Sequence, residues 1–216
     1  MPDDARLMKN KAVTVARLLD EHYPADTKCF LRHEQPHELL VATILSAQCT
    51  DDMVNKVTPA LFEKYRTIDA FARADVDELK HFIHSTGFYN IKAKNIIAAM
   101  TMLRDDFGGI MPSEIEKLIK MPGVGRKTAN VVRGHIFGIP SIVVDTHVGR
   151  ISRKLGLTTH EDPEKAEYDL MNLLPEEYWI KINTQLITHG RRVCKAQRPA
   201  CRECFLRDLC GYINDD

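Results

Sequence analysis

Met121-Pro-Gly-Val-Gly-Arg-Lys127-Thr-Ala-Asn130 is the most informative stretch of this 216-residue chain. Its proline fixes φ, and Gly123 and Gly125 permit positive φ and a close approach to the backbone. Such a turn directs N–H groups outward at the start of a helix, where they can bind an anion as bulky as a DNA phosphate. The stretch therefore predicts a hairpin between two helices, on which Arg126 and the amine of Lys127 stand.

Helical patterns flank this hairpin on both sides. Before it, Ser113-Glu-Ile-Glu116 has the form of a capping box, in which Ser113 caps a helix and Glu116 reaches back. After it, apolar residues recur at helical spacing over residues 128–137, and Gly138 ends the helix. An isolated Gly-x-Gly would more often be a plain turn with a solvated lysine. Here the Gly-x-Gly occurs together with a proline, two basic residues and a helix on each side, and this combination favours an anion-binding site.

Helical signals continue through the rest of the chain, and strand signals are scarce. We expect helices over residues 11–21, 38–47, 51–65, 75–83 and 91–104. Residues 142–144 are the best strand candidate, but three residues cannot build a sheet. Hydrophobic residues make up 44% of the chain, which is enough for a sizeable core. The sequence therefore predicts an all-α fold.

The charge and hydropathy of the chain narrow its class. The formal net charge is zero, so the charge of the whole chain does not indicate a nucleic-acid partner. Between residues 181 and 207, however, every charged residue except Glu203 is basic, which predicts a basic face. No apolar run approaches the length of a membrane span, and the N-terminus has no apolar signal core. We therefore expect a cytoplasmic protein with no membrane partner.

Four of the six cysteines gather near the C-terminus, at Cys194, Cys201, Cys204 and Cys210. Disulfides are rare in cytosolic chains, so this spacing indicates a metal centre. Structural zinc usually shows two close ligand pairs, whereas only Cys201 and Cys204 form one here. Four thiolates on one irregular loop also suit a cubane iron–sulfur cluster. The spacing favours the cluster but leaves zinc and unligated thiols open.

A third signal is Asp145, at the end of an apolar run and just before a helix that closes at Gly156. One hypothesis makes it an ordinary helix N-cap. The other makes it a carboxylate held near Lys127, which stabilises developing positive charge on a sugar and helps to manage a proton. The two hypotheses are compatible, because capping would fix the carboxylate in place.

The hairpin, Asp145 and the cysteine loop together resemble the endonuclease III family of DNA glycosylase/AP lyases, a branch of the helix–hairpin–helix superfamily. The resemblance covers nearly the whole chain and implies a fold of two all-α domains. One is a six-helix barrel with the hairpin, at residues 29–139. The other joins residues 1–28 to residues 140–216 and carries a [4Fe–4S] cluster, because the cysteine spacing matches the family's cluster loop.

The resemblance also implies an activity. Family members are bifunctional enzymes of base excision repair that remove oxidised pyrimidines from duplex DNA and then nick the strand. Lys127 matches the family nucleophile, whose Schiff base allows β-elimination, and Asp145 matches the catalytic carboxylate. The implied partner is double-stranded DNA with a damaged pyrimidine or an abasic site. We expect a monomer, associated with the nucleoid if the source is a bacterium.

Further residues are assigned to DNA contact by the same resemblance. The damaged nucleotide must leave the base stack, and the family fills the gap with a glutamine and an apolar wedge. Gln48 occupies the glutamine position, and Phe88 occupies the wedge position, where leucine is commoner although phenylalanine can intercalate. Taken alone, Gln48 would be a surface residue at a helix end and Phe88 a core aromatic. The other expected DNA contacts are Gly123, Gly125, Arg126, Lys195 and Arg198. Ser46 and His147 either line the lesion pocket or have a purely structural role.

Other classes of protein remain open at this point. An adenine-mismatch glycosylase shares the hairpin and cluster but usually lacks the lysine, and it carries an extra C-terminal domain that this chain does not show after Cys210. A thymine-mismatch glycosylase also lacks the lysine. A non-catalytic DNA-binding or redox-sensing protein would explain the glycines and cysteines but leave Lys127 and Asp145 idle. Lys127 therefore favours the bifunctional enzyme.

Overall fold

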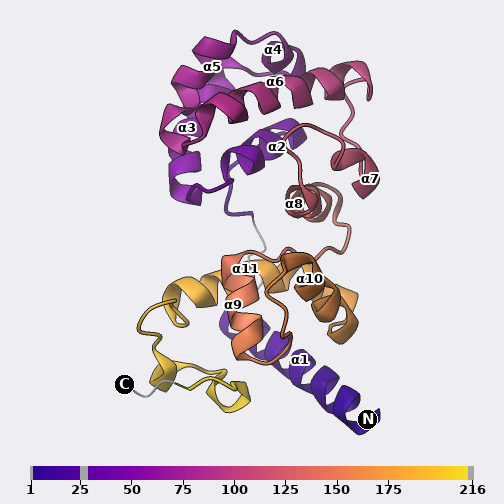
Figure 1. Ribbon diagram of the computed structural model, residues 1–216, viewed down its shortest axis with the longest axis vertical. Helices are drawn as coiled ribbons and strands as arrows, with labels where there is room; N and C mark the ends of the chain where they lie inside the picture. The colour runs from indigo at the N-terminus through magenta and orange to yellow at the C-terminus, as the bar shows by residue number, and fades with distance from the viewer. Residues whose placement is uncertain (1, 25–28, 214–216) are drawn as a thin grey trace. The chain divides into compact units, whose positions relative to one another are not determined.

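The computed structural model describes residues 2–24 and 29–213, and the predicted domain boundary at residue 28 lies outside these residues. Within them every regular element is helical, which confirms the predicted all-α fold (Figure 1). The chain divides into two compact units, one formed by Met1–Lys28 with Pro140–Asp216 and the other by Cys29–Ile139. No helix in the described ranges is both long and apolar enough to cross a membrane.

The unit Cys29–Ile139 is built around one apolar helix. Its elements are α2 (Pro36–Leu45), α3 (Asp51–Lys64), α4 (Ile68–Ala72), α5 (Val76–Ile83), the 3₁₀ helix η1 (His84–Thr86), α6 (Tyr89–Asp105), α7 (Ile115–Leu118) and α8 (Arg126–Phe137). Helix α2 is buried from His37 to Leu45 and contacts α3, α6 and α8 (Figure 1). A helix that is apolar on every face belongs in a core, and here it supports the helix that follows the hairpin.

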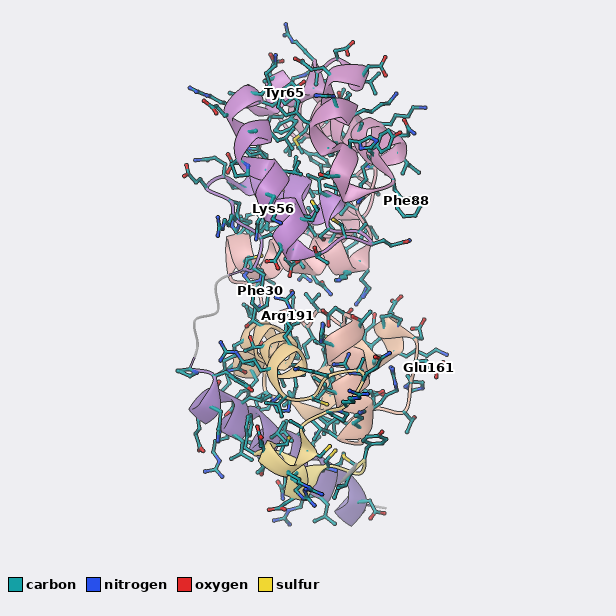
Figure 2. The ribbon with its side chains drawn as sticks, turned by 90° about the vertical axis from the view of Figure 1, so that its left-hand side faces the viewer. Phe30, Lys56, Tyr65, Phe88, Glu161 and Arg191 are labelled. Carbon is teal, nitrogen blue, oxygen red and sulfur yellow. The ribbon has the colours of Figure 1, made fainter. Side chains whose placement is uncertain are left out.

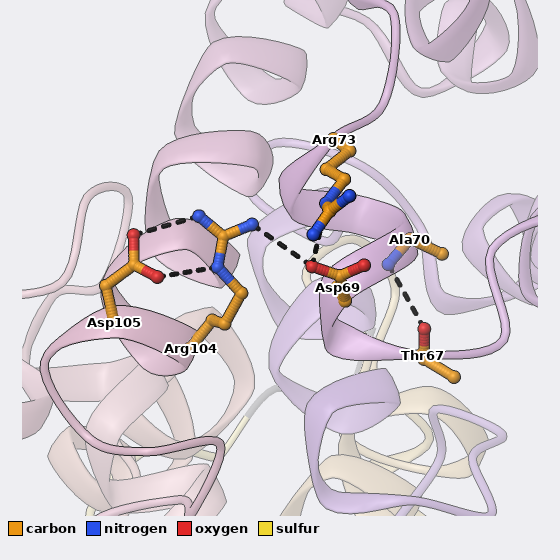
Figure 3. A network of polar contacts seen from close by, with 6 residues as sticks. All are labelled: Thr67, Asp69, Ala70, Arg73, Arg104 and Asp105. Carbon is orange, nitrogen blue, oxygen red and sulfur yellow. Dashed lines mark hydrogen bonds and ion pairs between the residues drawn. The ribbon is translucent and has the colours of Figure 1, made fainter.

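A polar network ties the short helix α4 to the C-terminal end of α6 (Figure 3). Arg104 of α6 donates 3.2 Å to Asp69 of α4 and pairs with both carboxylate oxygens of Asp105, at 2.6 and 2.9 Å. Asp69 also accepts from Arg73, and Thr67 caps α4 by accepting from the Ala70 amide. Solvent screens such surface pairs, so each contributes little to the free energy of folding, and the network mainly fixes the position of α4.

The second unit consists mainly of four α-helices. Its elements are α1 (Pro2–His22), α9 (Thr146–Lys154), α10 (Pro163–Leu173), η2 (Glu176–Tyr178), α11 (Trp179–Arg192), η3 (Cys201–Glu203) and η4 (Arg207–Leu209). Helix α11 contacts both α1 and α9. Asp20 connects α1 to α11, because its carboxylate accepts from Lys181 at 2.6 Å and from the side-chain amide of Gln185 at 2.7 Å.

Two local predictions need correction or completion. Ser113 does not cap α7: the helix begins at Ile115, with Glu114 as its N-cap residue. The Glu114 carboxylate accepts from the Ser113 amide and pairs with Lys117 at 2.5 Å, so Ser113 lies outside the helix, and no described side chain caps its first amides. Residues 142–144, the best strand candidate, are buried but form no strand within the described chain.

Candidate functional site

The hairpin places Lys127 in the first turn of a helix. Helix α8 starts at Arg126, two residues earlier than predicted, with Gly125 as its N-cap residue. The Lys127 side chain is exposed to solvent, whereas the apolar face of α8 is buried against α2. The helix ends at Phe137, and Gly138 closes it with a φ of 64°, which confirms the predicted stop.

The two hairpin glycines do different things. Gly123 has a φ of 77°, and a Cβ there would lie 2.9 Å from the Cβ of Asn95 in α6, so both the backbone and the packing require glycine. Gly125 has a φ of −90° and a ψ of 177°, and a Cβ there would meet nothing within 4 Å. Gly125 therefore does not use the positive φ that glycine permits, because an N-cap residue takes extended backbone, but it leaves the hairpin backbone open to close approach.

This difference gives a matched pair of variants. We expect Gly123→Ala to lower the free energy of unfolding by roughly 1–3 kcal/mol through backbone strain. Gly125→Ala should cost less than about 1 kcal/mol, because alanine is merely a poorer N-cap residue. Its methyl group should instead weaken duplex binding by obstructing the hairpin amides. Denaturant unfolding and DNA titration of both variants separate the two effects, and equal unfolding losses would contradict the assignment.

Asp145 is a helix cap in the structure, as one of the two hypotheses predicts. Its Oδ1 accepts from the Val148 amide at 2.8 Å and begins α9, and the buried residues 142–144 lead the chain to it. The carboxylate is partly exposed, so the cap orients it without burying it. Lys127 belongs to the unit Cys29–Ile139 and Asp145 to the other unit, and their catalytic roles stay predictions.

Three of the residues expected to contact DNA have a strained backbone. Among the described residues, the only non-glycine residues with positive φ are Gln48 at 52°, Phe88 at 48° and Arg198 at 50°. Each such conformation costs on the order of 1–3 kcal/mol and persists where function uses it. All three are expected to contact DNA on grounds unrelated to the backbone: the family resemblance for Gln48 and Phe88, and the basic cysteine loop for Arg198.

Phe88 is not a core aromatic. Its side chain is 60% exposed and stands away from the ribbon at the start of α6 (Figure 2). Gly87, with a φ of 69°, and Phe88 are two successive left-handed residues between η1 and α6. This turn keeps the ring outside the core, where its apolar surface is available to a partner.

Ser46 and His147, the lesion-pocket candidates, both make structural contacts. Ser46 ends α2 and donates to the Thr43 carbonyl at 2.8 Å. The His147 ring lies 3.3 Å from the guanidinium of Arg150, and a Cβ at Gly190 in α11 would overlap that ring. Sequence reasoning missed Gly190, although an isolated glycine inside a helical pattern is a recognisable sign of close packing.

The four C-terminal cysteines line a single cavity of about 30 Å³. None of them forms a disulfide. Cys204 Sγ lies 3.5 Å from Nε2 of His189, and burial raises the pKa of the Cys194 and Cys204 thiols. Arg150 of α9 donates to the Cys194 carbonyl at 2.6 Å and so connects this loop to the helix that Asp145 begins. In the described part of the chain, no His, Cys, Asp or Glu group is arranged to hold a single metal ion.

Lys195 and Arg198 are exposed on the same loop, between the first two cysteines. We expect Lys195→Ala and Arg198→Ala each to weaken binding about equally on all duplex sequences, and to reduce the slope of log K against log salt by about one phosphate contact. Binding titrations at several salt concentrations measure this slope. Unchanged slopes in both variants would show that the two cations are only solvated surface charges.

Comparison with known proteins places the chain among repair enzymes. The model of the HhH-GPD superfamily base excision DNA repair proteins matches residues 41–176. Endonuclease III of Synechocystis sp. is 50% identical over 203 residues, which cover 94% of this chain and 92% of that protein. A trapped endonuclease III–DNA covalent intermediate superposes with a TM-score of 0.89 and 45% identity, over 94% of this chain and 95% of that one. A thermostable thymine-DNA glycosylase, 21% identical over 94% of this chain and 96% of its own, shares the fold with a TM-score of 0.84.

Proposed function

The chain belongs to the endonuclease III family of HhH-GPD base excision DNA repair proteins, and on that premise we propose how its residues carry out the glycosylase and AP lyase reactions. The observation that carries the proposal is an exposed primary amine, Lys127, in the first turn of the helix that follows a glycine hairpin. Hairpin amides hold a phosphate of the backbone, and the amine stands beside it.

Lys127 is the nucleophile in this proposal. Its unprotonated Nζ attacks C1′ of the damaged nucleotide, the glycosidic bond breaks, and the base leaves with the bonding electrons. One amine proton is lost as the departing base takes up a proton, and transfer of the second to the ring oxygen opens the sugar ring and gives a Schiff base between Nζ and C1′. The imine acidifies the C2′–H bond, and removal of that proton expels the 3′ phosphate. The Asp145 carboxylate stabilises positive charge on the sugar while the base departs.

The substrate is double-stranded DNA with an oxidised pyrimidine or an abasic site, bound by a monomer in the cytoplasm. Gln48 and Phe88 fill the gap left by the extruded nucleotide. Gly123, Gly125 and Arg126 hold the backbone phosphate. The left-handed backbone of Gln48 and Phe88 supports these roles, because strain of this kind is kept where a side chain must be presented in a fixed direction.

Duplexes that carry single defined lesions test this function. We expect excision and strand cleavage on duplexes with an oxidised pyrimidine or an abasic site, read as a shortened strand on a denaturing gel. Excision of adenine or thymine from mismatches without nicking would instead indicate the mismatch-specific alternative. Binding without excision of any lesion would indicate a non-catalytic protein.

The cysteine loop fits a [4Fe–4S] cluster, which we propose as its resident cofactor. Four thiols without disulfides line one cavity, and they would hold the cluster as thiolate ligands. The cluster would supply structural rigidity, because the proposed reaction needs no electron transfer. It would fix the loop that presents Lys195 and Arg198 to DNA.

We expect the purified protein to be brown, with broad visible charge-transfer absorption and about four irons and four sulfides per chain. Acid release of sulfide and iron analysis measure the stoichiometry. Removing the metal should weaken duplex binding, since the loop would lose its fixed shape. A colourless protein with one zinc and no iron would overturn the cluster assignment.

A further inference from the structure

Lys92 is a buried cation in the unit that contains the proposed DNA-inserting residues. It lies in the second turn of α6, and its side chain is 3% exposed. Burying an ammonium group is costly, and a positive charge near a helix N-terminus opposes the helix dipole. Neither helix stability nor core packing therefore explains a lysine at this position.

The ammonium group of Lys92 is held by two carbonyl oxygens from different elements. It donates 2.8 Å to the carbonyl of Leu45, the last residue of α2, and 2.8 Å to the carbonyl of Thr86, the last residue of η1. Carbonyls at helix C-termini carry partial negative charge and lack intrahelical partners, so a cation satisfies both. Burial lowers the pKa of Lys92, while the thiolate form of the nearby Cys49 raises it.

These two carbonyls lie immediately before the two strained turns. Leu45 is followed by the turn to Gln48, and Thr86 is followed by Gly87 and Phe88. The Lys92 amide also donates to the Phe88 carbonyl, at 3.1 Å. One side chain thus joins the bases of both turns, whose tips are exposed and assigned to the same gap in the base stack.

We propose that Lys92 is a positioning residue for nucleotide extrusion: by binding the Leu45 and Thr86 carbonyls together, it holds Gln48 and Phe88 at the spacing needed to fill the emptied base stack. This inference rests on the insertion role proposed for Gln48 and Phe88. Lys92 touches neither the substrate nor the reacting atoms, and it acts through the two turns.

Lys92→Met tests the proposal, because methionine keeps an unbranched side chain only one atom shorter but loses the charge and the donors. Single-turnover cleavage is measured on an abasic duplex and on the same abasic strand without its complement, where no extrusion is needed. We expect roughly 10²-fold slower cleavage of the duplex, as for a misplaced positioning group, and unchanged cleavage of the single strand. The fluorescence of 2-aminopurine opposite the abasic site should show the same slowing on the duplex.

A second experiment, in a protein that lacks both inserted side chains, separates a positioning role of Lys92 from an effect on overall stability. In a Gln48→Ala, Phe88→Ala protein there is nothing left to position, so adding Lys92→Met should cause no further slowing on the duplex. Lys94→Met is the matched control, since Lys94 is an exposed lysine of the same helix, and it should behave as the parent. If Lys92→Met does not fold, Lys92→Gln, which keeps an uncharged NH₂ donor group, is judged by the same criteria and should show a smaller loss.

Two results would overturn the proposal. One is an equal loss on single-stranded and duplex DNA, which would place Lys92 in the chemistry or in the fold. The other is an undiminished loss in the double-alanine background, which would show that Lys92 does not act through Gln48 and Phe88. Failure of the unsubstituted protein to cleave the abasic duplex would count instead against the proposed lyase reaction, so the two failures are distinguishable.

Discussion

Lys127→Gln should abolish the covalent protein–DNA adduct that borohydride traps during turnover, and nearly all strand cleavage with it. Borohydride reduces an imine, and glutamine has no amine with which to form one. Binding to damaged duplex should persist, because the hairpin amides and Arg126 remain and Lys127 makes no contact that α8 needs. Denaturing gel electrophoresis of the trapped reaction shows the adduct directly.

Lys120→Gln is the matched control for this variant. Lys120 is also exposed and lies just after α7, so its replacement removes one nearby amine without touching α8. We expect it to keep the trapped adduct. Near-normal trapping by Lys127→Gln on a base-damaged duplex would show that the nucleophile lies elsewhere. Base excision without nicking would restrict Lys127 to the lyase step and favour attack by water.

Asp145→Asn should slow base release by roughly 10²–10⁴-fold while the protein stays folded. Asparagine can still accept from the Val148 amide, and it caps helices about as well as aspartate, so α9 should keep its start. What the variant loses is the negative charge that would oppose the charge developing on the sugar. Single-turnover excision from an oxidised-pyrimidine duplex measures the step.

Asp162→Asn provides the control for capping alone. Asp162 caps α10 by accepting from the Lys165 amide at 2.9 Å, in the same manner as Asp145. Both asparagine variants should therefore unfold at nearly the same denaturant concentration as the parent, and only Asp145→Asn should lose activity. A comparable loss in both would reduce Asp145 to a structural cap.

Local signals made the helices and the hairpin predictable. The capping oxygen of Asp145 acts on an amide three residues away, and Gly138 ends α8 through its own backbone, so both can be inferred from nearby residues. The all-α class follows because each predicted helix shows its apolar period within a turn or two, whereas α4, α10 and α11 are not predicted individually. Family resemblance added the roles of Lys127 and Asp145, which experiments must still test.

What the sequence could not show depends on contacts between distant segments. The exposure of Phe88 follows from the turn after η1 and not from the residue type, which alone suggests burial. The two carbonyl partners of Lys92 come from separate elements, although a lysine on an otherwise apolar helix face is a sign that a buried cation needs partners. The partner of Gly190 in its tight fit, the His147 ring, likewise becomes visible only when α9 meets α11.

The left-handed backbone of Gln48, Phe88 and Arg198 implies a conflict between thermal stability and the proposed repair activity. Glycine adopts positive φ without steric cost, so it would relieve the backbone at each of these positions, yet it would remove the side chain that we propose contacts DNA. Directed evolution scored only on survival at high temperature should therefore drift towards glycine at these three positions. Selection for tolerance of oxidative DNA damage should restore the larger residues, the usual conflict between stability and activity.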